Sequence, residues 1–206
     1  MSSKQELLNS LREKGFSKKI VDAFSRVKRE NFIPRNISAM AYEDTPLPIG
    51  HGQTISQPYT IAVMLSLMDL RKAQKVLEIG SGCGYVLALI SEIIGQNGKV
   101  YGIEVIRELA EKSRKNIMDY ENVKVYNKNG VEGLEEKAPF DRIIISAAIR
   151  DIPEKIMGHL KNNGIIVAPK GSRFEQELIA IQRKSKSEFE IKKKIPGFIF
   201  VPFVGG

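Results

Sequence analysis

Three glycines at alternate positions follow a short apolar run, and this spacing indicates a ligand site. Residues 76–79 are apolar apart from one glutamate, and Gly80, Gly82 and Gly84 come directly after them. Residues 86–94 are then apolar at helical spacing. A strand, a glycine turn and a helix form a nucleotide-binding arrangement, because glycine lets the backbone approach a ligand and the helix N-terminus favours negative groups.

An acidic residue at the end of the next apolar run predicts a ribose contact. Residues 100–104 are predicted as the second strand, and a carboxylate at its tip, Glu104, can accept hydrogen bonds from both ribose hydroxyls. The dinucleotide fingerprint needs another glycine where this chain has Tyr85. The pattern therefore favours a mononucleoside with an amino-acid tail, S-adenosylmethionine (SAM), over NAD. A glycine turn that binds no ligand is the less favoured alternative.

The elements that position this turn alternate between strands and helices. The predicted strands are 76–79, 100–104, 122–126, 140–145 and 164–168, and the predicted helices between them are 86–94, 107–118 and 152–160. This order predicts an α/β fold: a doubly wound, mostly parallel sheet with helices on both faces. Ligands of such sheets lie at the carboxyl ends of the strands. Asn129 and Gly130 follow the third strand, so they are candidates for the adenine edge, with an ordinary Asn-Gly turn as the alternative.

Helical patterns precede this core and a strand pattern follows it. Residues 4–14 and 17–27 predict an N-terminal helical cap, and residues 176–183 with 189–195 predict a hairpin that adds a C-terminal β extension. We expect a single domain over 1–206. Its expected parts are the helical cap and active-site loop (1–70), the nucleotide-binding core (71–170) and the β extension (171–206).

Residues 42–58 are rich in proline, glycine and small polar side chains. This composition predicts a loop without a long helix or a regular strand. A loop of this length inside a compact domain is usually functional or disordered, and its isoleucines argue against disorder. Because a helix pattern at 59–67 links it to the first strand of the sheet, we expect the loop to lie over the glycine turn.

Composition bears on the binding partners, the cellular location and the membrane segments expected for the chain. The net charge of +8 permits a nucleic-acid partner, but a solvated surface rich in lysine and glutamate is the favoured explanation. One cysteine fits a reducing, cytoplasmic location. We expect no transmembrane helix, because no apolar run reaches 18 residues. The polar first residues lead into a helix pattern, so no signal peptide is expected.

Residues 48–58 and 76–85 together closely resemble the signature of protein-L-isoaspartate O-methyltransferases. Residues 138–141, 146–153 and 200–203 match later blocks of that family, and the resemblance runs from about Leu7 to Phe203. It implies a SAM-binding fold that methylates the free carboxylate of isoaspartyl residues in damaged proteins and starts their repair. The implied partners are isoaspartyl peptides and proteins, the implied product is S-adenosyl-L-homocysteine, and no metal or membrane is involved.

The resemblance also assigns residues to the site. Ser56 matches the active-site serine of the family. The residues assigned to the cofactor are Thr54, Ile55, Ser56, Glu78, Ile79, Gly80, Ser81, Gly82, Cys83, Gly84, Glu104, Asn129 and Gly130. The chain departs from the family pattern at three positions: Asn129 replaces an aspartate, Cys83 replaces serine or threonine, and Val204 stands where some members have a hydroxyl residue.

Methyl transfer from SAM to a carboxylate requires few side chains of the protein. An acceptor carboxylate has a reference pKa near 3.5 and is ionised at neutral pH, so no general base is required. Positioning then carries most of the catalysis.

Three competing functions are weighed against this one. The first is an RNA methyltransferase, suggested by the net charge and the basic residues 183–194. Nucleic acid is disfavoured because the residues after the fourth strand, 146–149, lack the motif of amine methyltransferases. The second is a non-catalytic SAM-fold binding module, and the third, more distant, is an NAD oxidoreductase.

Overall fold

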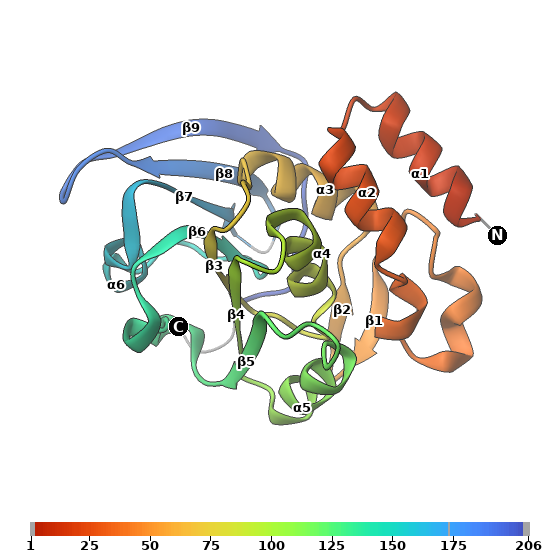
Figure 1. The fold of residues 1–206 in the computed structure, drawn as a ribbon. Coiled ribbons are helices and arrows are strands. Elements are labelled where there is room, and N and C mark those ends of the chain that lie inside the picture. Colours follow the sequence, from red (N-terminus) through yellow and green to blue (C-terminus); the bar gives the residue numbers. More distant parts are fainter. Residues whose placement is uncertain (1–2, 173, 204–206) are drawn as a thin grey trace.

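A seven-stranded sheet forms the centre of the computed structural model, which describes residues 3–172 and 174–203 (Figure 1). Val204 lies outside the described residues. The strand order is β5-β4-β3-β6-β7-β8-β9, parallel from β5 to β7 and antiparallel beyond. The strands are β3 (Lys75–Ile79), β4 (Lys99–Glu104), β5 (Val123–Asn127), β6 (Phe140–Ile145), β7 (Leu160–Gly171), β8 (Gln176–Arg183) and β9 (Phe189–Pro196). The predicted mostly parallel sheet with an antiparallel extension is confirmed.

Both faces of this sheet are buried, because side chains alternate from one face to the other along each strand. Val76 of β3 packs in the larger hydrophobic cluster, and its neighbour Leu77 packs in the smaller one. The larger cluster contains helical residues such as Leu8 and Leu87, while the helical residue Ile156 joins the smaller cluster. The helices that follow the sheet strands are α4 (Tyr85–Ile94), α5 (Arg107–Asn116) and α6 (Glu154–Gly158). Helices therefore cover both faces, as the sequence predicts.

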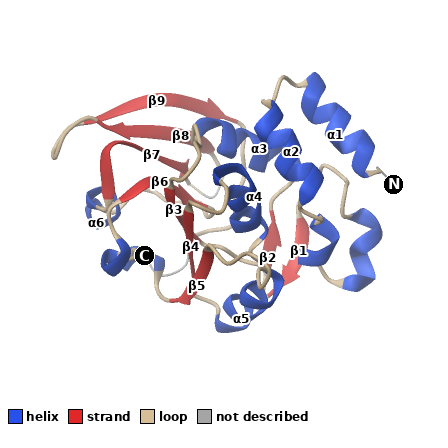
Figure 2. Cartoon of the chain, in the orientation of Figure 1, coloured by secondary structure: helices blue, strands red, loops and turns tan. Residues whose placement is uncertain are grey.

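The N-terminal residues form a helical layer beside α4, the helix that follows the glycine turn (Figure 2). It consists of α1 (Lys4–Glu13), α2 (Lys18–Arg26), two short 3-10 turns (Arg29–Phe32 and Arg35–Met40) and α3 (Pro58–Leu67). The rings of Phe24 and Phe32 meet the ring of Tyr85 edge-on, at 6.2 and 5.3 Å between centroids. Since Tyr85 begins α4, the layer packs directly against the helix that follows the turn. Within the described ranges, every helix is too short or too polar to cross a bilayer.

One expectation about the active-site loop is wrong. Residues 42–58 contain a short antiparallel hairpin, β1 (Leu47–Gly50) and β2 (Gln53–Ile55). Leu47 pairs with Ile55, and both side chains are buried. His51 has a φ of 55°, and it lies between two glycines with positive φ, which gives the tight reversal. Burial of alternate apolar residues thus outweighs the proline and glycine content, and a register shift after Pro48 accommodates the proline.

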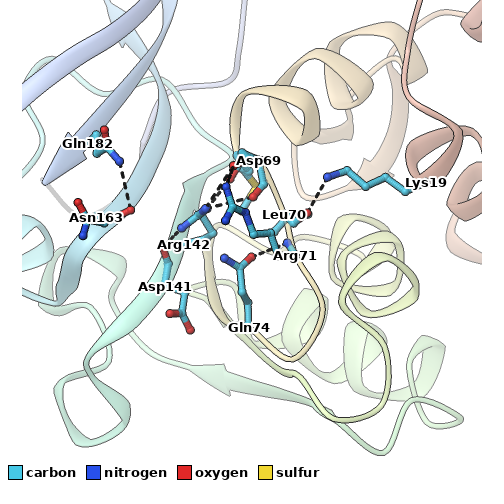
Figure 3. Close-up of polar contacts among 10 residues, drawn as sticks. Lys19, Asp69, Leu70, Arg71, Gln74, Asp141, Arg142, Asn163 and Gln182 are labelled. Carbon is cyan, nitrogen blue, oxygen red and sulfur yellow. Dashed lines mark hydrogen bonds and ion pairs between the residues drawn. The ribbon is translucent and has the colours of Figure 1, made fainter.

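The far end of α3 is fixed to the sheet by a buried arginine (Figure 3). Arg142 of β6 donates hydrogen bonds to the backbone oxygens of Met68 and Asp69, the latter at 3.1 Å. Its own neighbour Asp141 accepts from the backbone N–H of Lys75 at 2.8 Å. The start of β3 and the end of α3 are therefore held together at the amino ends of the strands, opposite the glycine turn.

Candidate active site

The glycine turn after β3 requires glycine at its alternate positions. Gly80, Gly82 and Gly84 have φ values of 82°, 51° and 88°, in the left-handed region that other residues adopt at a cost. The backbone N–H groups of Gly80 and Ser81 donate to the carbonyl oxygen of Ile103 in β4, at 2.8 and 3.0 Å. The turn is thereby anchored to the neighbouring strand.

The carboxylate of Glu104 ties this turn to the end of β4. One oxygen accepts from the backbone N–H of Gly82 at 2.8 Å, and the other accepts from Ile106 at 2.9 Å. Each carboxylate oxygen can accept two hydrogen bonds, so the group keeps capacity for further donors. Glu104 lines a cavity together with Gly80 and Gly82, and those further donors would come from a ligand in that cavity.

This cavity, which we call the outer cavity, extends to the end of β5. Its lining includes Thr54, Ile79, Gly130 and Phe203. A Cβ atom on Gly130 would lie 2.5 Å from Cγ2 of Ile79 and 3.0 Å from Cζ of Phe203. Gly130 is therefore needed for the close packing at this end. Across the turn, a Cβ on Gly82 would meet Cδ1 of Ile49 at 3.2 Å, which confirms that the hairpin lies over the glycine turn.

A second cavity, which we call the inner cavity, shares Gly80 and Gly82 with the outer cavity and is lined by buried residues whose polar atoms lack partners in the described chain. It is lined by Ser56, Glu78, Ser81, Cys83 and Ser146, among others. The Ser146 hydroxyl donates to one oxygen of Glu78 at 2.7 Å, while the other oxygen of Glu78 and the Ser81 hydroxyl have no partner. Unpaired buried polar groups are costly, and a ligand in this cavity would supply the missing hydrogen bonds.

Burial changes the acidity of two groups at the inner cavity. Desolvation raises the pKa of Glu78 to about 8, against a hydrogen bond from Ser146 that lowers it, and the charge of Glu104 raises it further. Desolvation likewise raises the pKa of Cys83 to about 11. Cys83 is thus a neutral thiol at neutral pH and is not activated as a nucleophile.

An open cleft of about 430 Å³ meets these cavities at three hydroxyl residues. Thr54 and Ser146 line the cleft and both cavities, and Ser56 lines the cleft and the inner cavity. The remaining wall of the cleft comes from the first turn of α3 and from residues 195–201. A group bound in the cleft therefore approaches a ligand of the cavities beside these hydroxyls.

The structure brings most of the predicted residues to these cavities. The outer cavity is lined by Thr54, Ile79, Gly80, Gly82, Glu104 and Gly130, and the inner cavity by Thr54, Ile55, Ser56, Glu78, Gly80, Ser81, Gly82 and Cys83. Gly84 and Asn129 line neither of them. A Cβ on Gly84 would meet Oγ of Ser113 at 2.6 Å, so this glycine lets α5 pack close to the turn. The Asn129 side chain accepts from the backbone N–H of Val131 at 3.0 Å.

Sequence reasoning missed Ser146 as a site residue. It directly follows β6, which pairs with β3, and its N–H donates to Ile79 at 2.9 Å. A polar residue at the carboxyl end of a strand next to the glycine-turn strand was the available signal. Phe203 was likewise missed as a wall of the outer cavity, because only the folded C-terminal segment brings it to Gly130.

The pKa of Glu78 predicts a pH dependence of stability. Its folded-state pKa of about 8 lies above the ordinary value of 4.5, so between these values the unfolded chain loses a proton that the folded chain keeps. The stability linked to the neutral carboxyl is complete below about pH 4.5 and is lost as the pH rises toward 8. Glu78→Gln does not titrate. Urea denaturation should show wild type losing stability relative to this variant across that window, and a constant difference would contradict the assignment.

Comparison with known proteins identifies the family of this chain. The family model described as protein-L-isoaspartate(D-aspartate) O-methyltransferase (PCMT) matches residues 2–206. A protein-L-isoaspartate O-methyltransferase of Methanothrix thermoacetophila is 45% identical over 98% of this chain and 95% of its own length. A protein-L-isoaspartate O-methyltransferase 2 of Archaeoglobus fulgidus is 42% identical over 98% of this chain and 93% of its own.

Solved structures of the same description share the fold. One protein-L-isoaspartate O-methyltransferase superposes with a TM-score of 0.89 at 28% identity, covering 99% of this chain and 66% of the other. A beta-aspartate methyltransferase (PCMT) described from Plasmodium falciparum, in complex with S-adenosyl-L-homocysteine, gives a TM-score of 0.83 at 26% identity, with 98% and 99% covered. From the family match over nearly the whole chain and these relatives, this chain belongs to the protein-L-isoaspartate(D-aspartate) O-methyltransferase family.

Proposed function

We propose that this chain transfers a methyl group from SAM to the free carboxylate of L-isoaspartyl residues in damaged proteins, the first step of their repair. The observation that carries the proposal is the meeting of the cleft with both cavities at Thr54 and Ser146, and with the inner cavity at Ser56. A peptide carboxylate in the cleft and a cofactor along the glycine turn would meet there. Family membership supports the same substrate and cofactor.

The donor set of the two cavities fits SAM. The remaining acceptor capacity of Glu104 suits ribose hydroxyls, and the unpaired oxygen of Glu78 suits the ammonium of a methionine tail. The Ser81 hydroxyl, also unpaired, lies at the same cavity as Glu78. The pocket beside Gly130 and Phe203 suits a flat adenine ring. We assign Gly84 and Asn129 the supporting role of shaping the turn and the end of β5.

The chain's own groups contribute positioning rather than proton transfer. When bound, SAM supplies an electrophilic methyl group on a sulfonium, and S-adenosyl-L-homocysteine is the product. The acceptor carboxylate is already ionised at neutral pH. The Ser56 hydroxyl donates a hydrogen bond that aims one carboxylate oxygen, and the hairpin of β1 and β2 covers the turn and limits the access of water.

We also propose that residues 1–206 act as one domain, in which cap, core and extension share one interior. The larger hydrophobic cluster joins Leu8 of α1, Val76 of β3 and Phe200 near the C-terminus. The cytoplasmic location stays a prediction.

The basic residues 183–194 are the feature that an RNA substrate would use. Two of their lysines are paired within the hairpin of β8 and β9: Lys184 with Glu190 at 2.7 Å, and Lys194 with Glu177 at 3.2 Å. These ion pairs reduce the positive potential of the strand. We therefore treat methylation of RNA as the alternative function, to be detected by the substrate test.

The substrate test compares a short isoaspartyl peptide with its normal aspartyl twin in methyl transfer from labelled SAM. We expect base-labile label on the isoaspartyl peptide alone, because an ester of that carboxylate is the product. Label on neither peptide, while SAM still binds, would refute the proposed acceptor. RNA labelled in the same assay would favour the RNA methyltransferase.

Replacement of Ser56 tests its role in aiming the acceptor. Ser56→Ala should lower kcat roughly ten-fold or more, because a hydrogen bond to a charged group is lost. The Kd of SAM should stay within about two-fold of wild type. Ser66→Ala, an exposed serine in α3, is the matched control and should behave as wild type. A large loss of SAM binding with normal kcat would contradict the role of Ser56.

Glu104 gives an independent test of the cofactor site. Glu104→Gln keeps the shape but removes the charge and places an NH2 group against one of the two backbone donors, Gly82 or Ile106. We expect the Kd of SAM to rise roughly ten-fold or more in titration calorimetry. Glu108→Gln, an exposed change in the first turn of α5, is the control. Equal affinity of both variants and wild type would remove Glu104 from the ribose site.

A further inference from the structure

We infer that Arg29, which lies in the helical layer, is a positioning residue that fixes the backbone of Ser56; the inference rests on the proposed function. Arg29 is fully buried, with 0% of its surface exposed. Within the described part of the chain, no carboxylate forms an ion pair with it. A buried charge needs other partners, and here they are backbone carbonyl oxygens.

The guanidinium of Arg29 donates to four carbonyl oxygens from two separate segments. One terminal nitrogen reaches Ala41 at 2.7 Å and Glu43 at 3.3 Å. The other reaches Thr45 at 3.2 Å and Ser56 at 3.1 Å. The same cation thus joins the segment that enters the β1–β2 hairpin to the residue that leaves it. Both ends of the hairpin are held at one point.

A second bond fixes the chain just after Ser56. Asp44, from the same entering segment, accepts from the backbone N–H of Tyr59 at 2.8 Å. Two anchors therefore hold the chain at Ser56 and directly after it: Arg29 holds the Ser56 carbonyl oxygen, and Asp44 holds the first turn of α3. They fix the backbone that places Ser56 in the walls of the cleft and the inner cavity.

Only arginine suits this position. Its planar guanidinium presents five N–H donors in a rigid fork and stays charged, so it can serve carbonyls on two sides at once. A lysine ammonium is a single centre on a flexible stem. Arg29→Lys keeps the positive charge but cannot bridge the 41–45 segment and Ser56 with the same geometry.

The chain provides a matched control at the C-terminal end of α3, the helix that follows Ser56. Arg142 is also buried, with 6% of its surface exposed, and donates to the carbonyl oxygens of Met68 and Asp69 after α3 (Figure 3). Ser56 precedes α3, and a ten-residue helix is about 15 Å long. Arg142→Lys thus disturbs the same kind of buried arginine without touching the hairpin.

The test measures the thermal midpoints of Arg29→Lys and Arg142→Lys. It then measures kcat, KM and the Kd of SAM for both variants at a temperature below both thermal midpoints. We expect both variants to lose thermal stability. Arg29→Lys alone should lower kcat roughly ten- to hundred-fold, because small misplacements of a positioning group are costly, while the Kd of SAM stays within about two-fold. Unchanged kcat in Arg29→Lys, or parallel loss of kcat in both variants, would overturn the inference.

Amide hydrogen exchange separates this inference from the proposed function, because it needs no methyl transfer. In Arg29→Lys, residues 53–57 should exchange faster than in wild type, and in Arg142→Lys they should not. If wild type fails to methylate the isoaspartyl peptide, the proposed function falls and the exchange still decides the role of Arg29. Equal exchange of residues 53–57 in all three proteins would refute it.

A surface variant covers the case in which Arg29→Lys does not fold. Asp44 is exposed, and Asp44→Ala removes the acceptor for the Tyr59 N–H without disturbing the interior. We expect kcat to fall several-fold with SAM affinity unchanged, because one of the two anchors of Ser56 is lost. A kcat equal to that of wild type would show that the 41–45 segment does not position Ser56.

Discussion

The site depends on one carboxylate that holds two strand ends together. Glu104 accepts from the backbone N–H groups of Gly82 and Ile106, so the glycine turn after β3 and the exit of β4 have one relative placement. The parallel pairing of β3 with β4 brings both ends to the same edge of the sheet. The hairpin then packs on the turn through Ile49, and its residues reach the cavities only because the turn is fixed.

Around this anchor the molecule tolerates polar burial that a purely structural core would avoid. Glu78 is buried in β3 with one oxygen unpaired, and the Ser81 hydroxyl is also unpaired. Such groups reduce stability in the free protein, and a ligand bound in the inner cavity would supply their missing hydrogen bonds. In Arg29, carbonyl oxygens of the main chain satisfy both terminal nitrogens, while Nε has no partner among the described residues. The Ser113 hydroxyl and Nδ1 of His159 are also unpaired and line neither cavity, so the buried polar groups at the cavities are distinguished by their position beside a ligand-sized space.

Local patterns predicted the strands whose apolar residues are contiguous or alternate over a long enough run in the sequence. The strands at Phe140–Ile145 and Gln176–Arg183 have the bounds expected from their apolar patterns, and the glycine turn was recognised from its spacing. The hairpin in residues 42–58 was missed because its strands are stabilised by burial of Leu47 and Ile55, which depends on the folded context. Ser146 and Arg29 were missed for a related reason: their partners, Glu78 and Ser56, are distant in the sequence.

A crystal structure with S-adenosyl-L-homocysteine and an isoaspartyl peptide would show directly whether cofactor and substrate meet at the proposed site. We expect the ribose hydroxyls on the carboxylate of Glu104, the sulfur at the junction of the cavities and the cleft, and the isoaspartyl carboxylate within hydrogen-bond distance of the Ser56 hydroxyl. A ribose bound away from Glu104, or a peptide carboxylate that does not reach Ser56, would contradict the proposed site.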